Sequence, residues 1–476
     1  MKNKQKMRMF QFCKNEVKGK IPFKRLVTLL VFCLFLTSCS SSQITLSNLL
    51  EEVNEEHKLV ERKNIDFQEY LRKPTKSIRF DPYNSQFNMS EEKFDSQKSL
   101  TWEEMQEDID YLFDFLHDSY ALYDYFGGDE VFGKAKEAVI KECQLSESKT
   151  GEVLEQSFLK NLTFIKDAHF SLNQKYPAAN TYPFFYRETG FVKTEDGYQT
   201  TDGKKVQSIE GYDNLDELMK RSVSADGDLV YYPVILQKCE DYQKTYDQQE
   251  YQTDKELIVC YQDGTKQTLK AEPFKLYVES TEGNTCALEK IDNIPILKIE
   301  QFNQIGNRKL NEYIDILKES PISILDLRSN GGGDINVAQG LMRRYAGENI
   351  SDSMMMVNAW EGIQLEAANK EWVENENILI IIVGKYTVSA AESLVDMAYN
   401  LENTIIVGEN TNGGMYGGSI SNQLPNSKIL VACATWQFYI PTSDNFEELC
   451  GFFPDIWVPA DEAENLILQY IKKHQN

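Results

Sequence analysis

Histidine is scarce in this sequence, and neither histidine nor cysteine stands in a metal-binding pattern. Four histidines and nine cysteines occur among 476 residues, and no C-x-x-C pair is present. Structural zinc sites need closely spaced Cys and His ligands, so this pattern argues against them. The complete G-x-x-x-x-G-K-[ST] and G-x-G-x-x-G motifs of nucleotide-binding loops are also missing. We therefore expect no metal and no cofactor.

Positive charge is sparse outside the N-terminus. Residues 1–38 contain nine Lys and Arg and one acid, Glu16. The rest of the chain contains 41 Lys and Arg against 73 Asp and Glu, a net charge of −32. So acidic a surface repels phosphate groups, which argues against nucleic acid as a partner.

The N-terminus has an apolar run that is too short for a membrane span. Leu26–Leu36 follows the basic stretch and falls short of the roughly 20 residues that a span needs, so residues 1–38 are typical of a signal peptide. The sequence Leu36-Thr37-Ser38-Cys39 follows and resembles the lipobox of bacterial lipoproteins. That resemblance implies lipid attachment at Cys39 and anchoring to the outer face of the bacterial cell membrane. An ordinary secretory signal or a short N-terminal anchor are the alternatives, and each places the body of the protein outside the cytoplasm.

The sequence does not determine whether disulfide bonds form. An exported protein is able to form them, but one sequence does not give their pairing. Buried free thiols are an equal alternative for the six cysteines of the body, which are Cys143, Cys239, Cys260, Cys286, Cys433 and Cys450.

Composition and periodicity divide the body of the chain into four segments. Residues 39–98 are polar and charge-rich, which predicts a tether with one helix candidate at 46–60. Residues 99–170 show helix caps and helical spacing and predict a helical domain. Residues 171–290 are rich in Tyr, Val and Thr with Asp–Gly turn pairs, and they predict a β-rich subdomain with one helix at 215–222. Residues 291–476 complete the chain.

The segment 291–476 has the pattern of an α/β domain. Continuous aliphatic strands separated by helices predict a largely parallel sheet covered on both faces. The expected strands are Ile294–Ile299, Ile322–Leu327, Ile378–Val383 and Thr404–Val407.

Two turns of this domain suggest chemistry. Ser389 lies between the strand Ile378–Val383 and a helical segment, where a hydroxyl can be exposed beside the backbone N–H groups of a new helix. Asn330-Gly331-Gly332-Gly333 likewise follows a strand and opens a helix, so its N–H groups can face an anion. An oxyanion hole fits this loop better than a nucleotide site, and a tight turn without a ligand is the alternative.

Four motifs together resemble those of the tail-specific (C-terminal processing) serine peptidases. They are residues 326–333 (Asp-Leu-Arg-Ser-Asn-Gly-Gly-Gly), 387–392 (Thr-Val-Ser-Ala-Ala-Glu), 408–414 (Gly-Glu-Asn-Thr-Asn-Gly-Gly) and 451–456 (Gly-Phe-Phe-Pro-Asp-Ile). Their order matches the family, which implies a crotonase-like α/β catalytic domain. The resemblance covers the helical domain loosely. It is poor over residues 171–290, where many relatives carry a PDZ domain.

The resemblance implies roles for several residues. Ser389 would be the nucleophile, and the N–H groups of Ala390 and Gly332 would form the oxyanion hole, with Gly331 or Gly333 as alternatives to Gly332. One branch of the family pairs the serine with a lysine, but that position is Gly414 here. Lys385, nearby in sequence, is expected at the surface.

The tricorn-like branch uses a histidine instead, and here that position is His169. An imidazole titrates near neutrality and can accept the serine proton. By resemblance Glu448 orients the ring, with Glu447 as its competitor, and Ala168 replaces the auxiliary serine. The other histidines are interpreted as solvated (His57 and His474) or packed in a helical core (His117).

The sequence thus predicts a lipid-anchored, extracytoplasmic serine peptidase acting on peptide or protein substrates. The alternative is a catalytically inactive envelope protein of the same fold that binds peptides or another ligand, because a shared fold does not establish function. Esterase or transpeptidase chemistry on the same serine is a third possibility.

Overall fold

The computed structural model describes residues 45–73, 79–83, 89–240, 250–279, 285–303, 307–362, 364–365 and 371–475. The predicted signal peptide and Cys39 lie outside these residues. None of the described helices is both long enough and apolar enough to cross a membrane. The six cysteines of the body, all described, are free thiols.

A six-stranded sheet carries the candidate site. Its order is β12-β13-β14-β17-β18-β24; β12 pairs antiparallel with β13, and every other pairing is parallel. The prediction of a largely parallel sheet is confirmed. The strands are β12 (Cys286–Ile291), β13 (Ile294–Ile299), β14 (Ile322–Asp326), β17 (Ile378–Val383), β18 (Thr404–Gly408) and β24 (Ile456–Trp457).

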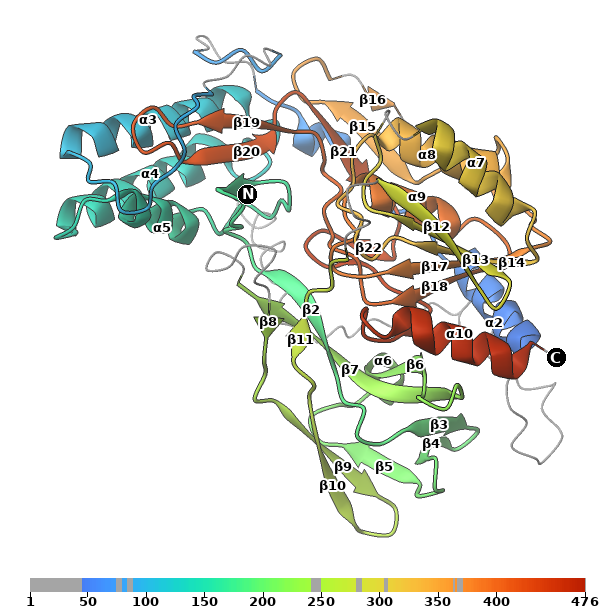
Figure 1. Ribbon diagram of the computed structural model, residues 1–476. Helices are drawn as coiled ribbons and strands as arrows, with labels where there is room; N and C mark the ends of the chain where they lie inside the picture. Colours follow the sequence, from blue (N-terminus) through green and yellow to red (C-terminus); the bar gives the residue numbers. More distant parts are fainter. Residues whose placement is uncertain are drawn as a thin grey trace, which may run out of the picture. The chain divides into compact units, whose positions relative to one another are not determined.

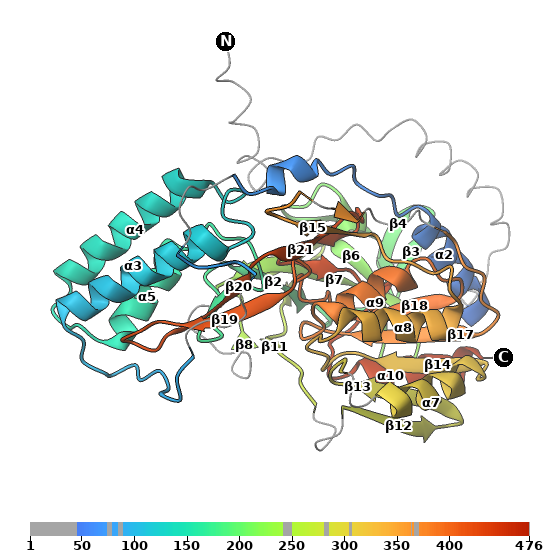
Figure 2. The same ribbon diagram turned by 90° about the horizontal axis from the view of Figure 1, so that it is seen from above.

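Helices cover both faces of this sheet (Figures 1 and 2). Successive strand residues point to opposite faces, so Ile381 packs in one core with α7, α8 and α9 while Ile380 and Ile382 pack in another with α2 and α10. The continuous apolar strands follow from this two-sided burial. The helices are α2 (Leu46–Lys58), α7 (Asn307–Lys318), α8 (Ile335–Ala346), α9 (Ala390–Ala398) and α10 (Ala463–His474).

Helix α2 shows that the predicted tether is in part a structural element. Thr45 caps it, and Leu49 and Val53 are fully buried against the sheet. Burying side chains of this size contributes about 1.5–3 kcal/mol each. His57, interpreted from sequence as solvated, is buried, and its Nε2 lies 2.9 Å from Oδ1 of Asp455. The interpretation of His57 as solvated was wrong, because the apolar stripe of a helix does not show which part of the protein the helix packs against.

Three helices form the core of residues 99–170, as predicted. They are α3 (Trp102–Ser119), α4 (Gly128–Leu145) and α5 (Gly151–Asn161). Thr101 and Glu104 form a capping box at the start of α3. His117, predicted to pack in the core, is instead one-third exposed and pairs through Nδ1 with Asp118 at 2.6 Å.

A hairpin from the C-terminal part of the chain completes this helical core. Strands β19 (Ser419–Gln423) and β20 (Leu430–Ala434) extend to α3–α5 in both ribbon views, and Val431 and Cys433 pack in the same hydrophobic cluster. The Asp108 carboxylate of α3 accepts the N–H groups of Asn426 and Ser427 in the hairpin turn, at 2.8 and 2.7 Å. Strand β1 (Ser171–Leu172) pairs with β20. The helical core is therefore built from two distant parts of the sequence.

Residues 180–275 are β-rich, with small antiparallel sheets. The predicted helix 215–222 is shorter, because α6 (Leu215–Leu218) ends where β6 (Met219–Val223) begins to pair with β7. One sheet has the order β2-β7-β3-β4 and another β10-β9-β5. The strands are β2 (Asn180–Phe185), β3 (Phe191–Thr194), β4 (Gly197–Thr200), β5 (Val206–Ile209), β7 (Leu229–Cys239), β8 (Glu250–Tyr251), β9 (Glu256–Tyr261), β10 (Lys266–Lys270) and β11 (Phe274–Lys275).

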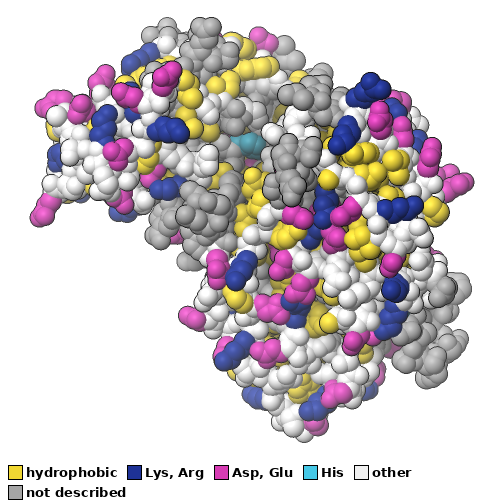
Figure 3. All heavy atoms as spheres, viewed as in Figure 1, with side chains coloured by type: hydrophobic (Ala, Val, Ile, Leu, Met, Phe, Trp, Pro, Cys, Tyr) yellow, Lys and Arg dark blue, Asp and Glu magenta, His cyan; other side chains and the backbone are white. Residues whose placement is uncertain are grey.

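The remaining strands are short. They are β15 (Met354–Asn358), β16 (Gln364–Leu365), β21 (Gln437–Pro441), β22 (Phe446–Glu447) and β23 (Gly451–Phe452). On the face drawn in Figure 3, acidic and basic side chains are interspersed, with hydrophobic side chains between them.

Candidate active site

Ser389 occupies a strained turn directly between β17 and α9. Its backbone has φ 60° and ψ −120°, a conformation that residues other than glycine rarely adopt. The surrounding structure must hold this strain, and such strain is concentrated at functional positions. The N–H of Ala390, the first residue of α9, has no acceptor among the described residues. It is therefore available to an anion at the helix N-terminus.

The glycine loop after β14 packs directly on this turn. A Cβ placed on Gly332, which has φ +91°, would lie 2.9 Å from Cβ of Ser389 and 2.9 Å from the carbonyl oxygen of Val388. Only glycine fits that space and that backbone conformation. The carbonyl of Asn330 accepts the N–H of Val388 at 3.2 Å, which joins the two turns.

The predicted second oxyanion donor is engaged within its own loop. The N–H of Gly332 donates to Oδ1 of Asn330 at 2.8 Å, and that of Gly331 donates to the carbonyl of Glu300 at 3.1 Å. The structure thus brings Gly332 and Ala390 together at Ser389. Among the described residues, the N–H groups of Ala390 and Gly333 have no hydrogen-bond acceptor, so Gly333 stays an alternative to Gly332.

Glu392 clamps the serine turn, and the sequence interpretation gave it no role. Its fully buried carboxylate accepts the N–H of Ser389 at 3.1 Å, the N–H of Gly414 at 2.8 Å, the N–H of Gly413 at 2.7 Å and the Thr411 hydroxyl at 2.5 Å. Burial raises the pKa of Glu392, while these four hydrogen bonds act in the opposite direction. The Ser-x-x-Glu spacing of a capping box was the available sequence signal.

Gly414 links the serine turn to the histidine segment. A Cβ on Gly414 would lie 2.8 Å from Cγ2 of Val388 and 3.2 Å from Cβ of Ala168. Gly414 is therefore wedged between the residues that precede Ser389 and His169. Any side chain here, including the lysine of the other branch, would require this contact to open.

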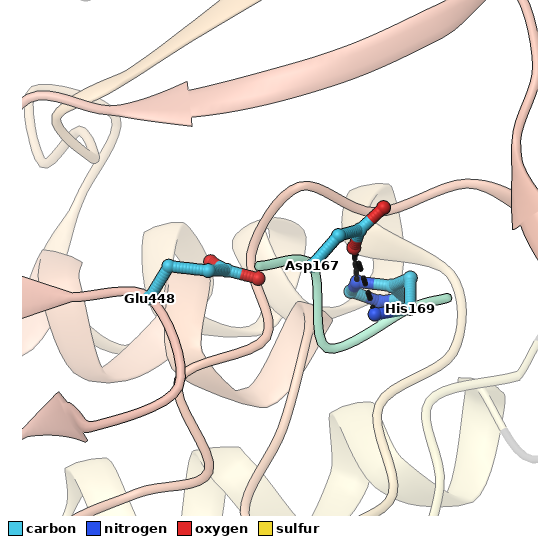
Figure 4. A group of neighbouring side chains, drawn as sticks. All are labelled: Asp167, His169 and Glu448. Atoms are coloured by element: carbon cyan, nitrogen blue, oxygen red, sulfur yellow. Dashed lines mark hydrogen bonds and ion pairs between the residues drawn. The ribbon is translucent and has the colours of Figure 1, made fainter. Parts of the chain in front are cut away.

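His169 lies with two carboxylates, and their three nearest donor atoms fall within 4.8 Å of one another (Figure 4). The two oxygens of Glu448 accept the N–H groups of Ala168 and Met415, each at 3.2 Å. Oδ1 of Asp167 lies 4.0 Å from Nδ1 of His169. Glu447 is exposed, so Glu448 is the glutamate that faces this cluster.

The imidazole is held by the loop that follows Gly414. Nδ1 of His169 accepts the N–H of Gly417 at 3.1 Å, so the neutral ring carries its proton on Nε2. Among the described residues no hydrogen bond joins His169 to Oγ of Ser389. Burial lowers the pKa of His169, and the negative charge of Asp167 opposes this. Burial, together with repulsion from Asp167, places the pKa of Glu448 well above its usual range.

This cluster has the donor types of a divalent-cation site, with two carboxylates and one imidazole. A tetrahedral zinc site needs a further ligand. Each of the three side chains already accepts a hydrogen bond from the protein. All three side chains are thus engaged by protein donors in the described state.

Lys385 is buried, contrary to the surface position expected from sequence. Its Nζ donates to the carbonyls of Thr411 and Asn412, at 2.7 and 3.0 Å, and to Oδ1 of Asn180 at 3.0 Å. Burial of the ammonium is tolerated because these oxygens surround it. Lys385 therefore holds the loop that leads to Gly413.

One further correction concerns His474, and one further buried residue belongs to the first motif. His474, expected to be solvated, is buried, and its Nε2 lies 3.1 Å from the carbonyl of Gly227. Arg328 of the first motif is also buried; it pairs with Asp326 and Glu464 at 2.6 and 3.0 Å. Asp326 and Arg328 of the motif therefore hold the end of β14 to α10. Within the motif, Gly332 is the residue that lies directly beside Ser389.

A strained serine at a helix N-terminus, beside a free backbone amide and a glycine loop, is an arrangement typical of serine hydrolases. Residues 293–458 match the model of "Peptidase family S41". This match covers about a third of the chain and agrees with the family that the sequence motifs predicted.

One curated relative and several solved structures are similar to the chain. The tail-specific protease of Haemophilus influenzae is 26% identical over 141 residues, which are 29% of this chain and 19% of that protein. The matched part thus spans about a fifth of the relative. The matched family and this relative are both peptidases by name.

Two of the similar structures have low scores. Mature CPAF is 11% identical, with 79% of this chain and 96% of that chain covered and a TM-score of 0.40. The tricorn protease is 14% identical, with 79% and 37% covered and a TM-score of 0.37. At these values neither likeness carries a conclusion about this chain.

Proposed function

We propose that the protein is an extracytoplasmic, lipid-anchored serine peptidase that hydrolyses peptide bonds through Ser389. The observation that carries this proposal is the strained Ser389 turn with the free Ala390 amide at its side. The contacts of Gly414 support His169 as the base, because they join the two segments that would have to cooperate. We also infer that residues 291–476 form a crotonase-like domain.

In the proposed mechanism, Oγ of Ser389 attacks the peptide carbonyl and Nε2 of His169 accepts its proton. The same nitrogen then returns the proton to the leaving amine. The N–H groups of Ala390 and Gly332 would bind the oxyanion, and Glu448 would orient the imidazole. No step needs a metal or a cofactor.

The mechanism requires two rearrangements of the described state. Nδ1 of His169 must carry the proton so that Nε2 can accept one, which means that the N–H of Gly417 must leave it. The N–H of Gly332 must also turn from Asn330 toward the substrate. Hydrogen bonds of catalytic groups often tighten only in the substrate complex.

A serine-reactive fluorophosphonate probe and a peptide-hydrolysis assay test this function. We expect Ser389→Ala and His169→Ala to lose both labelling and hydrolysis while their thermal unfolding stays near that of the wild type. Ser393→Ala is the matched control, because Ser393 lies in the same helix but its hydroxyl donates to Asp352 at 3.0 Å. Undiminished hydrolysis by Ser389→Ala would remove Ser389 from the mechanism.

A second candidate function is peptide or ligand binding without catalysis. It is favoured by the bond between Gly417 and His169 and by the engaged amide of Gly332, which leave the described site unready for attack. Well-folded wild-type protein that binds peptides but neither labels nor hydrolyses would establish this alternative.

The lipid anchor is proposed from the lipobox at Cys39. We expect Cys39→Ser to release the protein from the membrane fraction and to abolish incorporation of a labelled fatty acid. Retention of label by that variant would place the attachment elsewhere.

A further inference from the structure

The two carboxylates beside His169 are held differently. The side chain of Asp167 is fully buried, its Oδ1 lies 4.0 Å from Nδ1 of His169, and it accepts the backbone N–H of His169 at 2.8 Å. Both oxygens of Glu448 are committed to the N–H groups of Ala168 and Met415. In Figure 4 the interactions drawn run from Asp167 to His169 and none runs from Glu448. Asp167 is therefore the carboxylate nearest to the imidazole Nδ1.

A phenol fixes Asp167 in this position. The hydroxyl of Tyr120, a fully buried residue, donates to Oδ2 of Asp167 at 2.8 Å. Tyr120 follows helix α3 directly and packs among the aromatic side chains of the helical core, in contact with Phe126 and Phe170. The bond occupies one carboxylate oxygen and leaves the other oriented toward His169.

A buried imidazole that accepts a proton needs a negative partner. Taking a charge out of water is costly unless a hydrogen-bonded partner compensates it. The titratable groups around this cluster are Glu448, Tyr120, Tyr416, Cys433 and Glu392. Repulsion from Asp167 reaches the first four, and Glu392 repels Glu448. Among the described residues no Lys or Arg pairs with Asp167 or Glu448. Asp167 is thus placed to stabilise an imidazolium at His169.

We propose that Asp167, anchored by Tyr120, is a positioning residue that holds Nδ1–H of His169 when the imidazole accepts the serine proton. The inference rests on the proposed function, and it gives Asp167 the orienting role that was assigned there to Glu448. Glu448 would then bind the backbone of the histidine segment and of the Met415 loop, while Asp167 sets the tautomer and basicity of the ring.

The test measures the basicity of His169 directly. The sequence has four histidines, so a ¹³C-histidine NMR titration resolves the ring of His169, which His169→Ala assigns. We expect Asp167→Asn to lower the pKa of His169 by roughly one unit, because a neighbouring negative charge that favours the imidazolium is lost. In the pH profile of kcat/KM the acid limb should move to lower pH by the same amount, and kcat should fall roughly 100-fold.

Two further variants keep the inference falsifiable. Tyr120→Phe keeps the carboxylate but frees Oδ2, and it should shift the titration of His169 in the same direction by a smaller amount. If Asp167→Asn does not fold, the titration of His169 in Tyr120→Phe tests the role of Asp167. Asp118→Asn is the matched control, because it removes a carboxylate from His117 in the same domain and should leave His169 unchanged.

The outcomes separate this inference from the proposed function. An unchanged titration of His169 in a folded Asp167→Asn protein, or in Tyr120→Phe if the former does not fold, would overturn the role of Asp167. A wild-type protein without hydrolysis would instead refute the peptidase proposal, while the NMR titration would still report whether Asp167 supports the imidazole.

Discussion

Replacing Glu392 by Gln should loosen the turn that holds Ser389. The carboxylate accepts four hydrogen bonds, from the N–H groups of Ser389, Gly413 and Gly414 and from the Thr411 hydroxyl. The Gln amide has one oxygen, which can keep two of the N–H donors. Its NH₂ group can face the hydroxyl of Thr411, which is able to accept, but it then leaves the N–H of Gly413 unpaired.

The size of the effect follows from these contacts. One buried N–H left without an acceptor costs about 1–3 kcal/mol, and the remaining bonds lose their charge assistance. Burying a neutral amide instead of a carboxylate returns part of this loss. We therefore expect Glu392→Gln to lower the free energy of unfolding by about 2–4 kcal/mol.

Urea unfolding followed by circular dichroism measures this change, and peptide hydrolysis reports the state of the turn. Glu447→Gln is the matched control, because Glu447 is exposed and should change stability by less than about 0.5 kcal/mol. The reasoning about the clamp fails if Glu392→Gln and Glu447→Gln unfold at the same urea concentration.

Three further predictions concern the surroundings of the site. Gly332→Ala should reduce hydrolysis roughly 100-fold, because its Cβ would press on the serine turn, whereas Gly340→Ala, with open space around it, should retain activity. Lys385→Met should lower the free energy of unfolding by about 3 kcal/mol in urea titrations, because buried carbonyls lose a charged donor, while the exposed control Lys472→Met should not. Burial raises the pKa of Glu409 to about 7, so the folded protein holds a proton there that the unfolded chain releases above about pH 4.5. Stability should therefore fall by at most about 3 kcal/mol between pH 4.5 and 7, and Glu409→Gln should remove this slope in urea titrations.

The parallel sheet was predictable because its strands are continuous aliphatic runs that end at turn residues. β13 and β17 have the predicted bounds, and the Ser389 turn follows β17 as expected. Local patterns of this kind need no knowledge of distant partners. The same holds for the capped start of α3.

The missed features depend on partners far away in the sequence. The N–H of Gly417 and the imidazole of His169 are 248 residues apart, so no local pattern could predict their bond. Helix α2 has an ordinary amphipathic stripe, and only the sheet at residues 294–458 explains its burial. Lys385 was misplaced for the same reason, because the carbonyls that surround it come from another loop.

The shared helical core has a consequence for the order of synthesis. Helices α3–α5 leave the ribosome long before β19 and β20, whose Val431 and Cys433 complete their core. Domains otherwise tend to fold as units while the chain is being made. Here the segment of His169 cannot reach its final surroundings until the C-terminal hairpin arrives. A nascent chain would thus carry an unassembled site until nearly all of the protein has been synthesised.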